Sequence, residues 1–174
     1  MGVEEVGSRC SLKKPLKFRW FGNPDVPEGQ DLAAAISKFE EILEAPNLVQ
    51  NEYLAILATV EFEKKLKSAL LGALYPVTEI DRVGKRHGCP LYEIRWQWIN
   101  VQFIEPGGNI RDGQIRVRMY HSEPSEVPDH FVGHHVHEKD VSDSNSVNAL
   151  QDQEILVAVG HYQRGKPTRW GISS

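Results

Sequence analysis

The stretch that decides the fold runs from Leu91 to Val101 and reads LYEIRWQWINV. It is rich in aromatic and β-branched residues and partly alternates between apolar and polar positions, which is typical of a half-buried β-strand. Two later segments have a similar strand-like pattern. The segment IRVRMY at residues 115–120 alternates with period two, and FVGHHVH at residues 131–137 is another strand candidate. We therefore predict a small antiparallel sheet from Leu91 onward.

The residues before this stretch follow a helical period instead. Apolar side chains recur at helical spacing over residues 31–45, where Pro46 ends the helix, and over residues 52–74. A strand-like run at residues 16–21 precedes this helical pair, and a helix at residues 149–162 closes the chain. This order predicts an α+β fold, with the helical pair packed across the sheet and a C-terminal helix.

Length and composition narrow the class of protein. The 174 residues suit one domain, and 40% hydrophobic residues are too many for a fully disordered chain. We expect residues 1–15 to form a flexible arm and residues 16–174 to form a single domain. Cys10 and Cys89 make no disulfide framework, and neither a membrane span nor a signal peptide is recognisable, so we expect a cytoplasmic protein without membrane contact.

Charge is unevenly distributed along the chain, although its net value is only −4. Residues 24–63 carry one cation and nine carboxylates, whereas residues 64–95 carry seven cations and three carboxylates. The pattern indicates that different faces meet different partners. A solvated helix face beside an ordinary loop explains it equally well.

A histidine cluster is conspicuous in the second half of the chain, at His121, His130, His134, His135 and His137. His135 and His137 share one face of a strand, as in some metal sites, but Glu138 projects to the other face and no further ligand has a characteristic spacing. We therefore expect no metal and no cofactor, with a metal-dependent enzyme that uses the histidines as the alternative. His137 is our candidate for proton transfer, because the ordinary pKa of histidine lies near neutrality.

Cations on neighbouring strand candidates form the more informative pattern. They are Arg95 on the first strand, Arg116 and Arg118 on one face of the second, and His135, His137 and Lys139 on one face of the third. Like charges this close are usually neutralised by a phosphate or an acidic partner, which predicts an anion site. The alternative is that the arginines pair with carboxylates at the rim, at Glu105, Asp112 or Glu138.

Motifs of several large enzyme classes are missing from the sequence. There is no Walker loop, no GxGxxG, no GxSxG and no HExxH. The loop GKRHG at residues 84–88 places Lys85 and Arg86 between glycines. We interpret it as an exposed basic loop that contacts phosphate.

Three segments resemble a known family. They are RHGCPLYEIR at residues 86–95, GQIRVRMY at residues 113–120, and residues 131–139 followed by a loop and the helix DQEILVA at residues 152–158. They are similar to a strand that reads Gly-Leu-Tyr-Glu-Leu-Arg, an arginine-bearing strand that ends in an aromatic residue, and a final strand with basic residues and a closing helix in the RelE/HigB-type toxins of bacterial toxin–antitoxin modules. The phage-derived HigB-like branch is the most similar, and the matches span roughly residues 82–164.

The resemblance implies a compact RelE-like α+β fold and an endoribonuclease that cleaves messenger RNA, commonly on the ribosome, and is silenced by an antitoxin protein. Such cleavage uses the 2′-hydroxyl of the RNA as nucleophile, so the protein positions the chain, moves protons and stabilises charge. Carried over to this sequence, Arg95 falls at a basic strand position and Arg116 at the arginine of the next strand, with Arg118 as its rival. Lys139, with His137 close by, falls in the basic segment after the last strand.

These inferences define the expected site. Arg95, Arg116, His137 and Lys139 form the catalytic set, and Lys85, Arg86 and Arg118 contact RNA. The chain departs from the family in its net negative charge and in the segment HEKD at residues 137–140, which is less basic than its counterpart. A non-catalytic binding protein on the same scaffold is therefore the alternative function.

Overall fold

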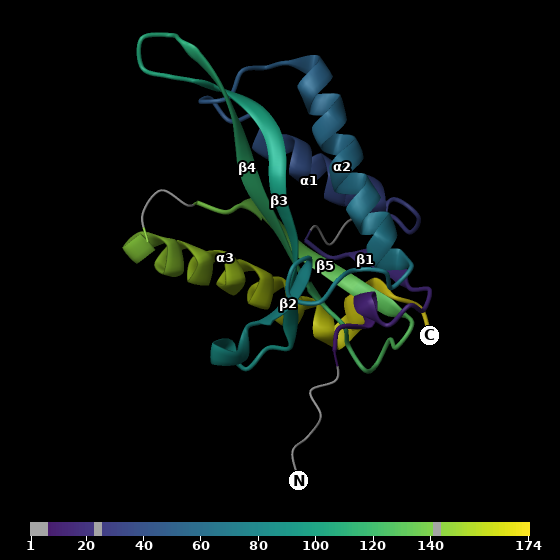
Figure 1. Cartoon of the computed structure of the whole chain (residues 1–174). Helices are drawn as coiled ribbons and strands as arrows, with labels where there is room; N and C mark the ends of the chain where they lie inside the picture. Colours follow the sequence, from purple (N-terminus) through teal and green to yellow (C-terminus); the bar gives the residue numbers. More distant parts are fainter. Residues whose placement is uncertain (1–6, 23–25, 141–143) are drawn as a thin grey trace.

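The computed structural model describes residues 7–22, 26–140 and 144–174, with the side chains of residues 144–147 left out. Helices and strands alternate along the chain in blocks (Figure 1). Their bounds are β1 Lys17–Trp20, α1 Asp31–Leu43, α2 Glu52–Leu70, β2 Ile80–Val83, β3 Leu91–Ile104, β4 Ile110–Ser122, β5 His130–Glu138 and α3 Ser144–Gly165. Short 3-10 helices form at Arg9–Ser11, Lys85–His87 and Lys166–Gly171.

One five-stranded sheet organises the molecule, with the strand order β1-β5-β4-β3-β2. The pairs from β2 to β5 are antiparallel, whereas β1 joins the edge of the sheet parallel to β5. The predicted α+β class, the antiparallel strands from Leu91 onward and the C-terminal helix are confirmed. The parallel edge strand makes the whole sheet mixed.

Helices cover both faces of the sheet (Figure 1). On the face of α1 and α2, Phe62 stacks between Phe39 and Trp96, with ring centroids 4.4 and 4.5 Å apart. On the face of α3, Tyr120 packs in a second apolar cluster with Ile155. Because alternate residues of a strand point to opposite faces, each central strand contributes to both layers.

Polar side chains fix the starts of the two N-terminal helices. Asn51 caps α2, because its side-chain oxygen accepts a hydrogen bond from the Leu54 amide at 3.2 Å. Asp31 is the first residue of α1 and not its cap. Its carboxylate accepts hydrogen bonds from the Arg19 side chain and from the Trp20 amide, both at 2.9 Å, and so joins α1 to β1.

The expectation of a flexible arm at residues 1–15 is wrong for residues 7–15, while residues 1–6 lie outside the described residues. Cys10 is fully buried, and its carbonyl accepts a hydrogen bond from the Leu74 amide at 3.0 Å. The Lys13 amide donates to the Gly72 carbonyl at 2.8 Å. This segment packs because it covers the end of α2, a contact that its own composition does not reveal.

Two further differences concern short or polar segments. Strand β2 was not predicted, and α3 begins at Ser144 inside a stretch that was expected to be a loop up to residue 148; residues 141–143 lie outside the described residues. In the described part of the chain, no helix is both long enough and apolar enough to span a membrane.

Candidate functional site

An open groove of about 690 Å³ lies along the β3–β4 hairpin and the end of β5. Its lining includes Trp98, Arg116 and Lys139. The Lys139 amide donates a hydrogen bond to the Arg116 carbonyl at 2.8 Å, so these two predicted site residues are neighbours just beyond the pair of Val117 with Glu138 at the end of β5. We call Arg116 and Lys139 the outer pair.

An irregularity in β3 turns Trp98 outward. The register with β4 shifts between Trp96 and Ile99, and both of these residues are buried in the core. Such a bulge re-aims the intervening side chains, and Trp98 is 66% exposed as a result. The Arg116 guanidinium lies over the Trp98 ring, 5.5 Å from its centroid. The groove thus presents an exposed aromatic face beside a cation.

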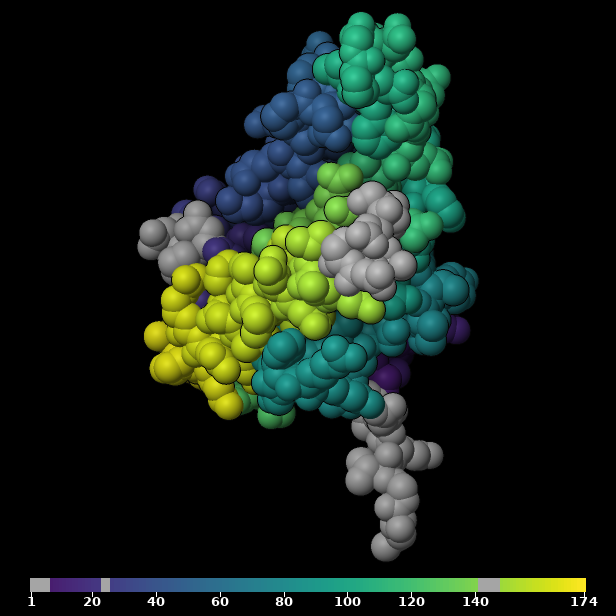
Figure 2. All heavy atoms as spheres, turned by 90° about the vertical axis from the view of Figure 1, so that its left-hand side faces the viewer, coloured from purple at the N-terminus to yellow at the C-terminus, as the bar shows by residue number. Residues whose placement is uncertain are grey.

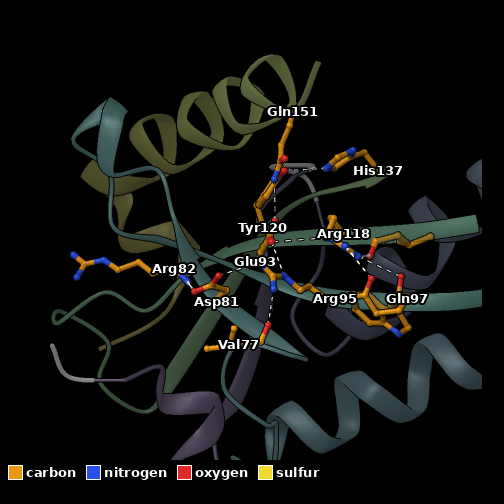
Figure 3. Close-up of polar contacts among 12 residues, drawn as sticks. Val77, Asp81, Arg82, Glu93, Arg95, Gln97, Arg118, Tyr120, His137 and Gln151 are labelled. Atoms are coloured by element: carbon orange, nitrogen blue, oxygen red, sulfur yellow. Dashed lines mark hydrogen bonds and ion pairs between the residues drawn. The ribbon is translucent and has the colours of Figure 1, made fainter. Parts of the chain in front are cut away.

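A buried polar cluster lies at the inner end of this sheet face, beneath α3 (Figure 3). It consists of Glu93, Arg118, Tyr120, His137 and Gln151, the last contributed by α3. The Gln151 amide donates to Glu93 Oε2 at 3.3 Å, and the Tyr120 hydroxyl lies 3.0 Å from His137 Nε2. Gln97 joins the cluster to the groove, because it lines the groove and accepts a hydrogen bond from Arg118 at 3.1 Å.

Arg95 is occupied by protein partners. Its guanidinium binds Glu93 Oε1 at 2.7 Å and Asp81 Oδ2 at 3.0 Å, and it donates a third hydrogen bond to the Val77 carbonyl (Figure 3). Two carboxylates therefore neutralise the cation. They differ from the rim carboxylates that the sequence suggested as partners.

Arg118 also binds protein groups and is more deeply buried than Arg95, with 2% of its surface exposed. It donates to the carbonyls of Val117 and Trp96 at 2.9 and 3.3 Å, and its Nε lies 4.0 Å from Glu93 Oε1. Burial lowers the pKa of Arg118, and the nearby Glu93 carboxylate opposes that effect. We call Arg95 and Arg118 the inner pair. Of the two rival arginines on β4, Arg116 is the one that faces the groove.

His137 has a different protonation state from the one we expected. Its Nδ1 lies 3.0 Å from the Glu138 carbonyl, which can only accept, so Nδ1 carries the proton and Nε2 accepts from the Tyr120 hydroxyl. Burial lowers the pKa of His137 to about 4. The ring is therefore neutral at pH 7, and the premise that both of its forms are available near neutrality is wrong.

Tyr120 completes this arrangement as a protonated phenol. Burial and the neighbouring Glu93 carboxylate raise its pKa above the usual value, although a hydrogen bond from Gln151 acts in the opposite direction. The protonated Tyr120 hydroxyl can therefore donate a hydrogen bond to His137 Nε2. Hydrogen bonds and ion pairs thus connect the residues of the inner cluster, although Nε of the buried Arg118 has no hydrogen-bond partner.

Two titratable groups that line the groove, Lys139 and Glu138, have pKa values that are shifted toward pH 7. Burial lowers the pKa of Lys139, and the nearby guanidiniums of Arg118, Arg95 and Arg116 lower it further. Partial desolvation raises the pKa of Glu138, although its side chain is exposed, and the neighbouring Asp140 raises it as well. An acid with a lowered pKa and a base with a raised one are the shifts that general acid–base catalysis uses.

Lys85 and Arg86 lie apart from the groove, in a second pocket of about 300 Å³ between their loop and α3. Gly84 and Gly88 bound the loop with φ of 81° and 64°, a conformation that favours glycine. The Arg86 side chain is 81% exposed and lies 3.6 Å from Asp152 of α3. Figure 2 shows this loop, in teal, against α3.

No family model, curated protein or solved structure matches the chain. The case for a function therefore rests on the geometry of the groove and on the resemblance of the three sequence segments.

Sequence reasoning missed the contributions of Trp98 and of α3. Gln151 contacts Glu93, and Glu154 pairs with His135, so α3 supplies partners to residues on two strands. Nothing in the spacing of these residues signals their position. The position of Glu93, in contrast, can be inferred from the sequence, because it lies two residues before Arg95 on the same strand and therefore on the same face.

Proposed function

We propose that this protein binds single-stranded RNA in the groove and cleaves it, as the toxin of a toxin–antitoxin module. One observation carries the proposal: the outer pair and an exposed tryptophan line the same open groove. Proteins that bind single-stranded nucleic acid place aromatic rings under the bases and cations along the phosphates. Messenger RNA, on the ribosome, is the proposed substrate, and an antitoxin protein is the proposed inhibitor.

Cleavage follows the chemistry of the RNA itself. The 2′-oxygen attacks the adjacent phosphorus, the bond from phosphorus to the 5′-oxygen breaks, and a 2′,3′-cyclic phosphate and a 5′-hydroxyl result. Glu138 accepts the proton of the 2′-hydroxyl, and Lys139 donates one to the leaving 5′-oxygen, in keeping with their opposite pKa shifts. Arg116 stabilises the charge that develops on the phosphoryl oxygens.

The inner residues act indirectly in this scheme. Arg95, Arg118 and His137 bind protein groups at hydrogen-bond distance, so we assign them as positioning residues that fix the strands beneath the groove. Lys85 and Arg86 extend the basic surface toward the second pocket, where they contact phosphates further along the RNA.

RNA binding without cleavage is the second candidate function. It is favoured by the low pKa of His137, about 4, and by the neutralisation of Arg95, which together leave fewer groups for proton transfer than the family resemblance implied. The two candidates differ in their products and not in their ligand.

The test measures binding and cleavage separately. A fluorescent single-stranded RNA reports affinity by anisotropy, and denaturing gels report cleavage by the wild type and by Trp98→Ala, Arg116→Ala and Lys139→Ala. Lys38→Ala is the matched control, because Lys38 lies on α1 and pairs with Glu41 at 3.1 Å, away from the groove.

We expect Arg116→Ala to reduce the cleavage rate about 100-fold, as loss of one well-placed donor typically does. Trp98→Ala should weaken binding about tenfold or more, since one stacked base contributes about 1–3 kcal/mol. If all three groove variants bind and cleave like Lys38→Ala, the groove is not the site. Binding by the wild type without any product supports the second candidate.

A further inference from the structure

A separate cluster of donor atoms lies on the opposite side of the sheet, toward α1 and α2. Cys10 of the N-terminal 3-10 helix, His121 near the end of β4 and Glu123 just after it place one ligand atom each within 4.8 Å of the others. Cys10 and His121 are fully buried, and the Glu123 side chain is 3% exposed. We call these residues the Cys10–His121–Glu123 cluster.

Two of the three separations between the ligand atoms fit tetrahedral coordination. With zinc–sulfur bonds of about 2.3 Å and zinc–nitrogen or zinc–oxygen bonds of about 2.0–2.1 Å, a tetrahedral ion separates sulfur from nitrogen by about 3.6 Å and nitrogen from oxygen by about 3.3 Å. Here Cys10 Sγ lies 3.8 Å from His121 Nε2, which lies 3.1 Å from Glu123 Oε1. Both separations are within a few tenths of an ångström of the tetrahedral values.

His121 Nε2 faces two partners at once. A ring nitrogen carries at most one proton, so it cannot donate to both the sulfur and the carboxylate. A cation at the centre would satisfy the lone pairs of all three ligand atoms together. Mixed sulfur, nitrogen and oxygen donors suit zinc, whereas calcium and magnesium prefer oxygen alone.

Surrounding groups hold the ligands in place. Glu123 Oε2 accepts from the Arg9 amide at 2.6 Å, and Ser8 donates to Glu123 Oε1. The His121 ring stacks on Tyr92, with centroids 5.6 Å apart, and contacts the edge of Phe131 at 5.4 Å. Outer groups that orient the ligands in this way are a regular part of metal sites.

A small pocket lies next to the residues that hold the cluster in place. A pocket of about 160 Å³ is lined by Ser8 and Tyr92, which contact Glu123 and His121 respectively.

We propose that Cys10, His121 and Glu123 bind a zinc ion that joins the N-terminal segment to the end of β4. This departs from the expectation of no metal, which considered only the spacing of the strand histidines in the sequence. The proposal is independent of the proposed function, because its residues lie on the other side of the sheet from the groove. A metal that binds the folded chain also stabilises it.

The experiment uses the purified full chain after treatment with a chelator. Zinc is titrated in competition with a chromophoric chelator, and cobalt(II) provides a spectroscopic probe, since a cobalt–thiolate bond absorbs in the near ultraviolet. The variants are Cys10→Ser and Glu123→Gln, and Cys89→Ser is the control because Cys89 is the other buried cysteine, in the apolar cluster on the α3 side.

We expect one zinc ion per chain, a rise in melting temperature with zinc, and a cobalt–thiolate band. Cys10→Ser should remove the band and weaken zinc binding at least tenfold, and Cys89→Ser should change neither. Glu123→Gln, which keeps the size of the side chain, should also weaken binding and covers the case in which Cys10→Ser does not fold. Absence of binding at micromolar zinc, or equal binding by the wild type and both site variants, would overturn the proposal.

Discussion

The inner and outer pairs of cations lie on one face of the same sheet and yet differ in what they can bind. Arg95 and Arg118 of the inner pair share the buried Glu93 as their nearest carboxylate, at 2.7 and 4.0 Å. Arg116 and Lys139 of the outer pair line an open groove, beside the exposed Trp98. On this sheet face, a buried carboxylate thus holds the inner pair in place, whereas the outer pair lies in an open groove beside an exposed ring.

The largest effect should follow from removal of Glu93, which is 1% exposed. Glu93→Ala leaves the inner pair without its shared carboxylate, and removal of one partner from a buried ion pair costs about 3–5 kcal/mol. We expect the free energy of unfolding to fall by this amount in urea denaturation.

Glu105→Ala is the control for this measurement. Glu105 pairs with Arg111 at 2.6 Å, but both side chains are largely exposed, and such pairs contribute about 0–1 kcal/mol. If Glu93→Ala destabilises the protein no more than Glu105→Ala does, the inner pair does not depend on Glu93.

A smaller effect concerns pH and His137, which lies beside the inner pair. Its pKa is about 4 in the folded chain and 6.5 when unperturbed, so the unfolded chain binds more protons between these values. Stability from this group is complete above pH 6.5 and is lost as the pH falls toward 4. We expect a loss of about 2 kcal/mol between pH 7 and pH 5 from His137 alone.

His137→Gln isolates this contribution from that of other groups. His134, with a pKa lowered to about 3 by burial, adds a loss over an overlapping range, but it is common to both proteins. The free energy of unfolding of the variant should therefore fall less steeply from pH 7 to pH 5 than that of the wild type. Equal slopes would contradict the low pKa of His137.

The smallest effect on stability should come from the outer pair. Arg116→Ala removes a contact with an exposed ring and no buried ion pair, so the free energy of unfolding should change by less than about 0.5 kcal/mol. Thermal unfolding of this variant, set beside its loss of RNA cleavage, separates folding from function. A strongly lowered melting temperature would place Arg116 with the inner pair.

The sequence predicts those parts of the fold that depend on local periodicity. Strands β3, β4 and β5 and helices α1 and α2 each contain enough alternating or helical positions to be recognised. Strand β2 has four residues, Ile80–Val83, and forms because it pairs with β3. The first residues of α3 are polar, so their helical state does not follow from an apolar pattern.

The site residues can likewise be divided into those that local periodicity places correctly and those that it does not. Strand parity is enough to place Arg95 and Glu93 on one face of their strand, because the period of two is a local property. Parity could not reveal that α3 brings Gln151 to Glu93. Spacing likewise could not reveal the Cys10–His121–Glu123 cluster, since Cys10 and His121 are separated by 111 positions in the sequence.

The parallel pairing of β1 with β5 has a consequence for the order of folding. Lys17 pairs with His130 and Trp20 with Gly133, so β1 is synthesised more than a hundred residues before its partner. At a synthesis rate of about 5–20 residues per second, the interval between the synthesis of β1 and that of β5 is on the order of ten seconds. Helices α1 and α2 contact each other locally and form during that time, whereas the edge of the sheet closes only after β5 has emerged.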